Sequence, residues 1–235
     1  LQNTDTPLVA SLDSDVVPAP QWLENLLRVL NAQDVVGVGG RLDEFYSDSI
    51  GDRWRAVHMA QHWGPEPRRN PRFLFGANTL FMTSVLNCLG GYNPSLRTNY
   101  EDMSLSELLY NNGFELFYEP AAKASHMRRD SEFSILRGYW QWHHAKGLLA
   151  GDFDSPQGVI SRIGRVNFGI FRHRFDMDMA AGRIELLQLD ILLPLVFCAL
   201  DLKKFHDVTG QPIPPLPLDD FISQLPDWPA ATLRK

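Results

Sequence analysis

Residues 7–15 read Pro-Leu-Val-Ala-Ser-Leu-Asp-Ser-Asp, a short apolar run that ends on Asp13 and Asp15. Such a run between polar residues is typical of a buried strand. Side chains two apart in an extended segment point the same way, so both carboxylates are expected to face one crevice at the strand end. Two such carboxylates repel unless a cation joins them, and oxygen ligands suit Mg²⁺ or Mn²⁺. The pair also fits a helix-capping aspartate beside a solvated one.

The chain downstream of this run changes character near residue 128. Before that point, short apolar runs alternate with helical spacing. This predicts helices at 20–31, around 54–63, from Ser84 to 89 and at 101–112. It also predicts strands at 35–38, 114–118 and 121–126, and a strand leading into a tight turn over 73–78. Beyond it, the periodicity is helical at 131–149, 156–171 and 184–205. We therefore divide the chain into an α/β half (1–128), a helical region (129–209) and a proline-rich extended tail (210–235).

Composition narrows the function classes. The 235 residues carry a net charge of −6, which argues against a nucleic-acid partner because phosphate binding needs clustered Lys and Arg. Cys88 and Cys198 are interpreted as buried free thiols in a reducing, cytoplasmic compartment. The apolar stretch 186–200 is interrupted by polar residues and proline, and fits a buried helix or a helix lying on the inner membrane face. The first residue is Leu, so a processed or cut piece is expected.

Three further groups of residues are candidates for chemistry. Glu101 and Asp102 begin a predicted helix, where they suit either a general base or simple compensation of the helix dipole. The small residues of Gly76-Ala77-Asn78 would let a ligand approach the backbone, or form a plain turn. His126 could be a third metal ligand, followed by arginines that could face phosphate oxygens, or an ordinary packed histidine.

The order of these motifs resembles the second half of the catalytic domain of GT-A glycosyltransferases of the inverting family 2. The matching segments, spread over residues 7–128, are Leu12-Asp13-Ser14-Asp15-Val16, Phe75-Gly76-Ala77-Asn78, Leu89-Gly90-Gly91-Tyr92-Asn93, Tyr100-Glu101-Asp102-Met103-Ser104-Leu105, Asn112-Gly113-Phe114, and Tyr118-Glu119-Pro120 to His126. The resemblance implies an α/β fold, with an incomplete GT-A mixed sheet followed by a helical C-terminal region.

The resemblance also implies a reaction, in which a sugar moves from a nucleotide-diphospho-sugar to a glycan or lipid-linked acceptor. Mn²⁺ or Mg²⁺ would be held against the diphosphate by Asp13, Asp15 and His126, with Asp15 the more direct ligand. Asp102 would be the base and Glu101 would orient it or contact the acceptor. The remaining residues assigned to the donor by this resemblance are Gly76, Ala77 and Asn78 at the sugar, and Arg129 and Arg137 at the phosphates.

This chain departs from the family pattern in two respects. Many relatives carry an acidic residue two positions after Glu-Asp and an Arg later in that helix, where this chain has Ser104 and Leu108-Leu109. Relatives also place several βα units before the Asp-x-Asp strand. Without them this chain is expected to be an inactive fragment that binds nucleotide sugar weakly, and its open 7–12 edge is expected to pair with a second copy or a missing N-terminal segment.

Other function classes stay open beside this one. A non-catalytic binding or scaffold remnant of the same fold would keep the architecture and lose turnover. A metal-dependent nucleotidyltransferase or phosphohydrolase would also use paired carboxylates, although such enzymes usually need further carboxylates or a glycine-rich loop.

Overall fold

The computed structural model describes residues 4–96 and 99–213. The chain divides into two compact units, Leu1–Ala145 and Lys146–Lys235. The boundary falls inside helix α5 (Glu132–Leu149), later than the boundary at 128 expected from the sequence. The reason is packing, because Tyr139 of α5 contacts Trp54 with ring centroids 5.1 Å apart and ties the start of this helix to the first unit.

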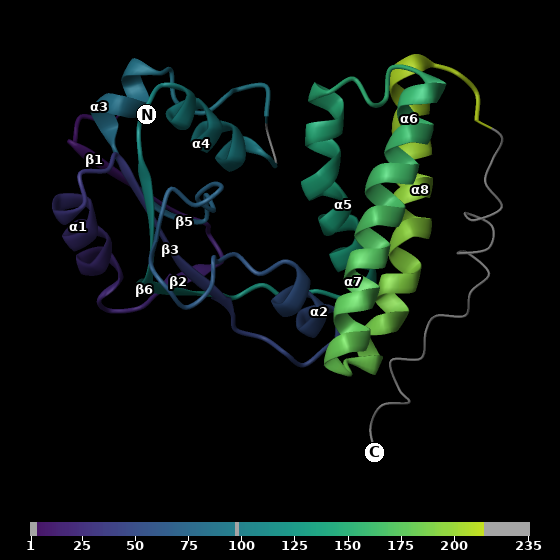
Figure 1. Ribbon diagram of the computed structural model, residues 1–235, viewed down its shortest axis with the longest axis horizontal. Coiled ribbons are helices and arrows are strands. Elements are labelled where there is room, and N and C mark those ends of the chain that lie inside the picture. Colours follow the sequence, from purple (N-terminus) through teal and green to yellow (C-terminus); the bar gives the residue numbers. More distant parts are fainter. Residues whose placement is uncertain (1–3, 97–98, 214–235) are drawn as a thin grey trace. The chain divides into compact units, whose positions relative to one another are not determined.

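The first unit is built on a mixed sheet (Figure 1). Its strands are β1 (Leu8–Leu12), β2 (Val16–Pro18), β3 (Gly37–Glu44), β4 (Arg68–Arg69), β5 (Asn78–Met82) and β6 (Leu116–His126). They lie in the order β1-β5-β3-β6-β2, and β4 pairs with β6. Only β3 and β6 are parallel among these pairs. Among the described residues β1 has β5 as its one neighbour, so covering of its outer edge by another segment or copy stays a prediction.

Helices cover both faces of this sheet. On one face α1 (Trp22–Ala32) buries Trp22, Leu26 and Val29 against Leu80 and its neighbours. On the other face α3 (Thr83–Cys88) and α4 (Glu101–Asn111) pack apolar side chains against Phe81. Because Leu80 and Phe81 are adjacent in β5, their side chains point to opposite faces of the sheet, so each face has its own core.

Some expected boundaries were wrong, and the largest error concerns residues 73–78. The predicted strand there is irregular up to a turn at Gly76 and Ala77, and the strand β5 begins only at Asn78. The three aromatic side chains Trp63, Phe73 and Phe75 pack on one another. This apolar run therefore forms a local aromatic cluster and is not a strand of the sheet.

Smaller corrections follow from packing in the same way. Ser84 does not cap its helix but lies inside α3, after Met82. The predicted strands 114–118 and 121–126 are one strand, β6, with an irregularity opposite the Gly40/Arg41 step. Cys88 is exposed and Cys198 is half-buried, so neither is the fully buried thiol expected from its apolar neighbours. Helix α2 (Ile50–His58) stops before His62 and Trp63.

Glycines 39 and 40 lie inside β3, whereas the strand predicted at 35–38 was expected to end at them. A Cβ added at Gly40 would meet the carbonyl oxygen of Ala122 at 2.1 Å, so β6 approaches this strand too closely for any side chain. We expect Gly40→Ala to lower the free energy of unfolding by about 1–3 kcal/mol, the usual cost of overpacking.

Chemical unfolding of the chain measures this effect. Gly138→Ala in α5 is the matched control, because the nearest atom to its new Cβ lies at 3.9 Å. Replacing this helical glycine by alanine should raise the free energy of unfolding by up to about 1 kcal/mol. Equal effects of the two substitutions would contradict the close approach of β3 and β6.

The second unit is mainly helical in its described part. It comprises α6 (Pro156–Arg162), the π-helical turn η1 (Ile163–Asn167), α7 (Phe168–Ala181), the 3-10 turn η2 (Ile184–Leu186) and α8 (Leu187–Thr209). Arg162 and Asp201 form a buried ion pair at 3.0 Å between α6 and α8. The proline-rich tail predicted from residue 210 lies outside the described residues from 214 onward.

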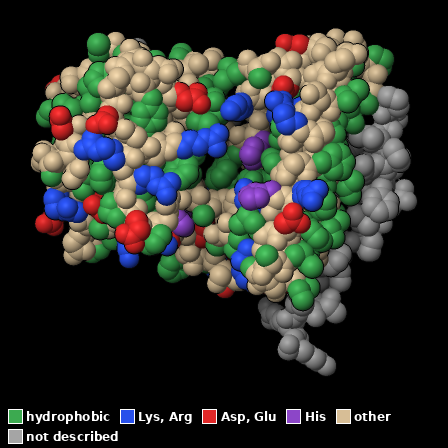
Figure 2. Space-filling view, in the orientation of Figure 1, with side chains coloured by type: hydrophobic (Ala, Val, Ile, Leu, Met, Phe, Trp, Pro, Cys, Tyr) green, Lys and Arg blue, Asp and Glu red, His purple; other side chains and the backbone are tan. Residues whose placement is uncertain are grey.

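The apolar stretch 186–200 of this unit is only partly buried. Leu189, Leu193 and Phe197 are buried, whereas Ile191 and Leu195 are about half exposed, at 52% and 49%. Figure 2 shows hydrophobic side chains on the visible surface of these helices. Among the described residues, no helix combines the length and the apolar character needed to cross a membrane.

Candidate functional site

The Asp-x-Asp segment crosses one end of the sheet. Since β1 pairs with β5 alone and β2 with β6 alone, residues 13–15 must pass over the carboxyl ends of β3 and β6. They do so as a turn, in which the Val16 amide donates to the Asp13 carbonyl at 3.1 Å. The predicted extended alternation of the two carboxylates is therefore wrong, and the turn itself places them at this edge. The Met127 amide donates to the Asp15 carbonyl at 2.7 Å and fixes the turn beside the end of β6.

Asp15 and His126 form a close pair of potential metal ligands at this edge. His126 Nε2 lies 3.3 Å from Asp15 Oδ2, and the imidazole is buried while the carboxylate is 40% exposed. Adjacent ligands of an octahedral ion with bonds of about 2.1 Å lie about 3 Å apart, so one divalent cation can contact both atoms. An imidazole nitrogen and a carboxylate oxygen also suit Mn²⁺ chemically. The residues present therefore fit a divalent cation.

Asp13 stands apart from this pair. Within residues 4–96 and 99–213, no set of three His, Cys, Asp or Glu ligand atoms within 4.8 Å of one another includes Asp13, Asp15 or His126. Its influence is electrostatic instead. Burial raises the pKa of Asp13, the charge of Asp15 raises this pKa further, and His126 opposes both.

Asp102 lies in the first turn of α4 and faces the turn before β5. Its Oδ2 accepts from the Gly76 amide at 3.2 Å and its Oδ1 from the Met103 amide at 2.6 Å. Burial raises the pKa of this carboxyl; these backbone donors oppose the rise, and the charge of Asp13 adds to it. The charge of Asp13 therefore acts on Asp102, and the turn at 13–15 and the start of α4 share one electrostatic environment.

Glu101 and Tyr92 belong to the same environment. Burial raises the pKa of Glu101, and the charges of Asp102 and Asp13 raise it further. Burial raises the pKa of Tyr92 to about 12, with Asp102 and Glu101 adding to the shift. Tyr92 therefore keeps its phenolic proton at neutral pH. Its side chain lines a cavity of about 260 Å³ between the 89–94 loop and α4.

Of the three residues predicted to line a sugar pocket, Asn78 does something else. It is fully buried, and its Oδ1 accepts from Trp22 Nε1 at 2.6 Å. Its Nδ2 donates to the carbonyls of Arg41 and Ala122. The side chain is thus engaged in joining α1, β3 and β6 and is not offered to a ligand. Ala77 is buried as well, which leaves Gly76, whose amide holds Asp102, at the edge itself.

The two arginines assigned to phosphate lie at the surface. Arg129 donates to Asp48 at 2.7 Å and its guanidinium lies 3.7 Å from the ring centre of Tyr46. Arg137 is exposed on α5. The structure therefore gives Arg129 partners of its own, and shows no contact that joins either arginine to the carboxylates at 13, 15 and 102.

Three buried charged residues near His126 were missed from the sequence. Glu44 at the end of β3 contacts His126 Nδ1 at 2.9 Å. Arg55 of α2 pairs with Glu44 at 3.0 Å and with Asp130 at 3.0 Å. What brings Glu44 beside His126 is the register of two parallel strands, which these residues end. That register is visible in the folded sheet and not in the sequence.

Comparison with known proteins finds similarity to a glycosyltransferase. The pre-mycofactocin glycosyltransferase of Mycobacterium tuberculosis strains CDC 1551 and H37Rv is 29% identical over 130 residues, 53% of this chain. The mixed sheet of this chain and the helices that follow it confirm the expected α/β fold class. The chain spans 27% of the length of these curated relatives, about a quarter. No family model matches it.

Two solved structures show partial likeness to this chain. GalNAc-T7 with UDP, GalNAc and Mn²⁺ has a TM-score of 0.41 at 15% identity, covering 52% of this chain and 28% of that one. The mannosyltransferase PcManGT from Pyrobaculum calidifontis, in complex with GDP-Man and Mn²⁺, has a TM-score of 0.38 at 15% identity, covering 94% and 55%.

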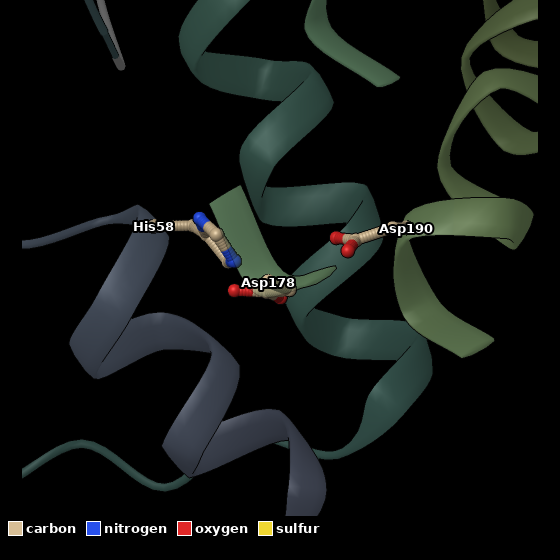
Figure 3. Close-up of side chains that lie close together, drawn as sticks. All are labelled: His58, Asp178 and Asp190. Atoms are coloured by element: carbon tan, nitrogen blue, oxygen red, sulfur yellow. The ribbon is translucent and has the colours of Figure 1, made fainter. Parts of the chain in front are cut away.

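Figure 3 labels three further buried side chains that carry potential ligand atoms. His58 ends α2 in the first unit, whereas Asp178 on α7 and Asp190 on α8 belong to the second. There, Asp178 accepts from Arg183 Nε at 2.7 Å, which links the end of α7 to the connection that follows it.

Proposed function

We propose that this chain carries the diphosphate-binding and base-bearing part of an inverting, metal-dependent glycosyltransferase that uses a nucleotide-diphospho-sugar. One observation supports this most: besides burial, the charge of Asp13 raises the pKa of Glu101 and Asp102, which lie far from it in sequence, and Asp15 of the same turn meets His126 at 3.3 Å. A cluster of carboxylates with raised pKa values is typical of a catalytic site.

In the proposed reaction, one side of this edge supplies the base and the other holds the cation. An acceptor hydroxyl oxygen attacks the anomeric carbon, the bond from that carbon to the diphosphate oxygen breaks, and its electron pair leaves with the nucleoside diphosphate. Asp102 takes the proton of the hydroxyl, and its raised pKa brings it closer to that task at neutral pH. The Gly76 and Met103 amides hold both carboxylate oxygens in place. The acceptor is proposed to be a glycan or lipid-linked sugar.

The other side of the edge is proposed to hold a divalent cation, Mn²⁺ or Mg²⁺. Asp15 Oδ2 and His126 Nε2 would bind it directly, and Asp13 would add negative charge from the same turn. Such an ion neutralises the charge that develops on a leaving diphosphate.

Asp15→Asn is expected to weaken Mn²⁺ binding by at least about tenfold, since the amide removes the charged oxygen of the pair. Calorimetry or Mn²⁺ electron paramagnetic resonance on the metal-free chain measures the affinity. Asp34→Asn is the control, because Asp34 is an exposed turn residue with a positive φ that Asn also tolerates. Unchanged affinity in the Asp15 variant would contradict its role as a ligand.

Product analysis of the full-length protein tests the proposed class. A glycoside together with a nucleoside diphosphate is expected, with inverted configuration at the anomeric carbon. Free sugar phosphate and nucleoside monophosphate would indicate a phosphohydrolase instead. Absence of any product with UDP-, GDP- and dTDP-sugars would favour a non-catalytic binding module of the same fold.

A further inference from the structure

The buried carboxylate of Glu44 has no role in the site as described so far, yet it touches the proposed metal ligand. Both its oxygens lie close to His126 Nδ1, at 3.0 and 2.9 Å. The opposite nitrogen of the same ring, Nε2, faces Asp15 at 3.3 Å. Both the imidazole and the Glu44 carboxylate are almost completely buried, each with 4% of the side chain exposed.

We propose that Glu44 is a positioning residue that holds His126 with its proton on Nδ1 and so presents the Nε2 lone pair toward Asp15 for a divalent cation. The argument rests on hydrogen-bond chemistry. An ionised carboxylate can only accept, so Nδ1, the nitrogen that hydrogen-bonds Glu44, must carry the proton. In a neutral imidazole the other nitrogen then has the free lone pair that a metal needs. This inference rests on the proposed function, which makes His126 a ligand.

The position of Glu44 is itself fixed by a chain of buried contacts. Arg55 Nε donates to Glu44 Oε1 at 3.0 Å, and Arg55 Nη1 donates to Asp130 Oδ2 at 3.0 Å. The Asp130 amide donates in turn to Asp52 Oδ1 at 2.8 Å, within the first turn of α2. Glu44 therefore has little freedom to turn away from the imidazole.

The register of the sheet explains why the two residues meet. Glu44 and His126 are paired residues at the ends of the parallel strands β3 and β6. Paired residues of neighbouring strands project to the same face, so the carboxylate lies beside the ring without any loop rearrangement. The contact is thus part of the fold and does not require a bound ligand.

The first measurement is the tautomer of His126 in the metal-free chain. Nitrogen-15 NMR, with the imidazole neutral and the signal assigned by its loss in His126→Gln, should show Nδ1 protonated and Nε2 unprotonated. A proton on Nε2 would overturn the inference. This readout does not depend on whether the protein binds metal or transfers sugar.

The second measurement is Mn²⁺ affinity. Glu44→Gln should weaken binding about 10–100-fold, the usual effect of removing the partner of a ligating histidine. Glu119→Gln is the matched control, because Glu119 is also buried in this sheet but pairs with Arg28. An unchanged affinity in a folded Glu44 variant would overturn the inference. Absence of Mn²⁺ binding in the unaltered chain would instead contradict the proposed function. If Glu44→Gln fails to fold, the NMR result decides.

Discussion

Replacing Asp102 by Asn in the full-length protein is expected to lower kcat for sugar transfer by about 10²–10⁴-fold, the usual contribution of a general base. The amide cannot take a proton from the acceptor hydroxyl, although it keeps nearly the same volume. KM for the donor should change little, because Asp15 and His126 belong to the other side of the edge. Steady-state kinetics with donor and acceptor varied separately measure the two constants.

Glu107→Gln is the matched control for this substitution. Glu107 lies on the same helix, is exposed, and contacts the Tyr100 hydroxyl rather than the turn at 13–15. Its rate should stay within about twofold of the unaltered protein, as for a surface substitution away from such features. Retention of the full rate by the Asp102 variant would remove this residue as the base.

The pH dependence of transfer follows from the same carboxyl. A base must be ionised to act, and burial raises the pKa of Asp102 above its ordinary value of 3.8. The rate should therefore be constant above the raised pKa and fall as pH drops through it, at a higher pH than an exposed aspartate would give. A rate that stays constant down to pH 4 would contradict the raised pKa of Asp102.

Much of the site could be anticipated because its motifs are local. Asp13-x-Asp15, Glu101-Asp102 and His126 each follow or precede a short apolar run, and residue order alone suggested one edge. The way in which the carboxylates reach that edge could not be read, because a turn and an extended pair give the same two-residue spacing. The pairing of β1 and β2 with opposite sides of the sheet decides this, and that pairing is long-range.

The parts that were missed depend on contacts between distant residues. Asn78 resembles a turn residue in sequence, but its amide satisfies groups on α1, β3 and β6. Gly40 resembles the end of a strand, but its missing side chain is what lets β6 approach. The sequence pattern of a single segment predicts neither role. Each depends on contacts with another strand or helix that packs against the residue.

Arg55→Met is expected to be among the most destabilising single changes in the first unit. It removes the cation that Glu44 and Asp130 share, and leaves both carboxylates buried, with 4% and 1% of their side chains exposed. Removing one partner of a buried ion pair usually costs about 3–5 kcal/mol. His126 and the partly exposed Arg128 still contact the two carboxylates, so we expect the lower end of that range. Urea unfolding followed by tryptophan fluorescence measures it.

A double-mutant cycle separates lost charge pairing from lost packing. If unpaired charge is the cause, Arg55→Met combined with Asp130→Asn should lose less stability than the sum of the two single changes, because the second substitution removes a carboxylate that the first left unpaired. Arg53→Met controls for loss of a guanidinium from the same helix, where its donors reach only the exposed carbonyls of Ser47 and Asp48. That change should cost within about 0.5 kcal/mol. Strict additivity in the cycle would mean that Arg55 acts mainly by filling space beside Trp142, whose ring centre lies 6.0 Å from its guanidinium carbon.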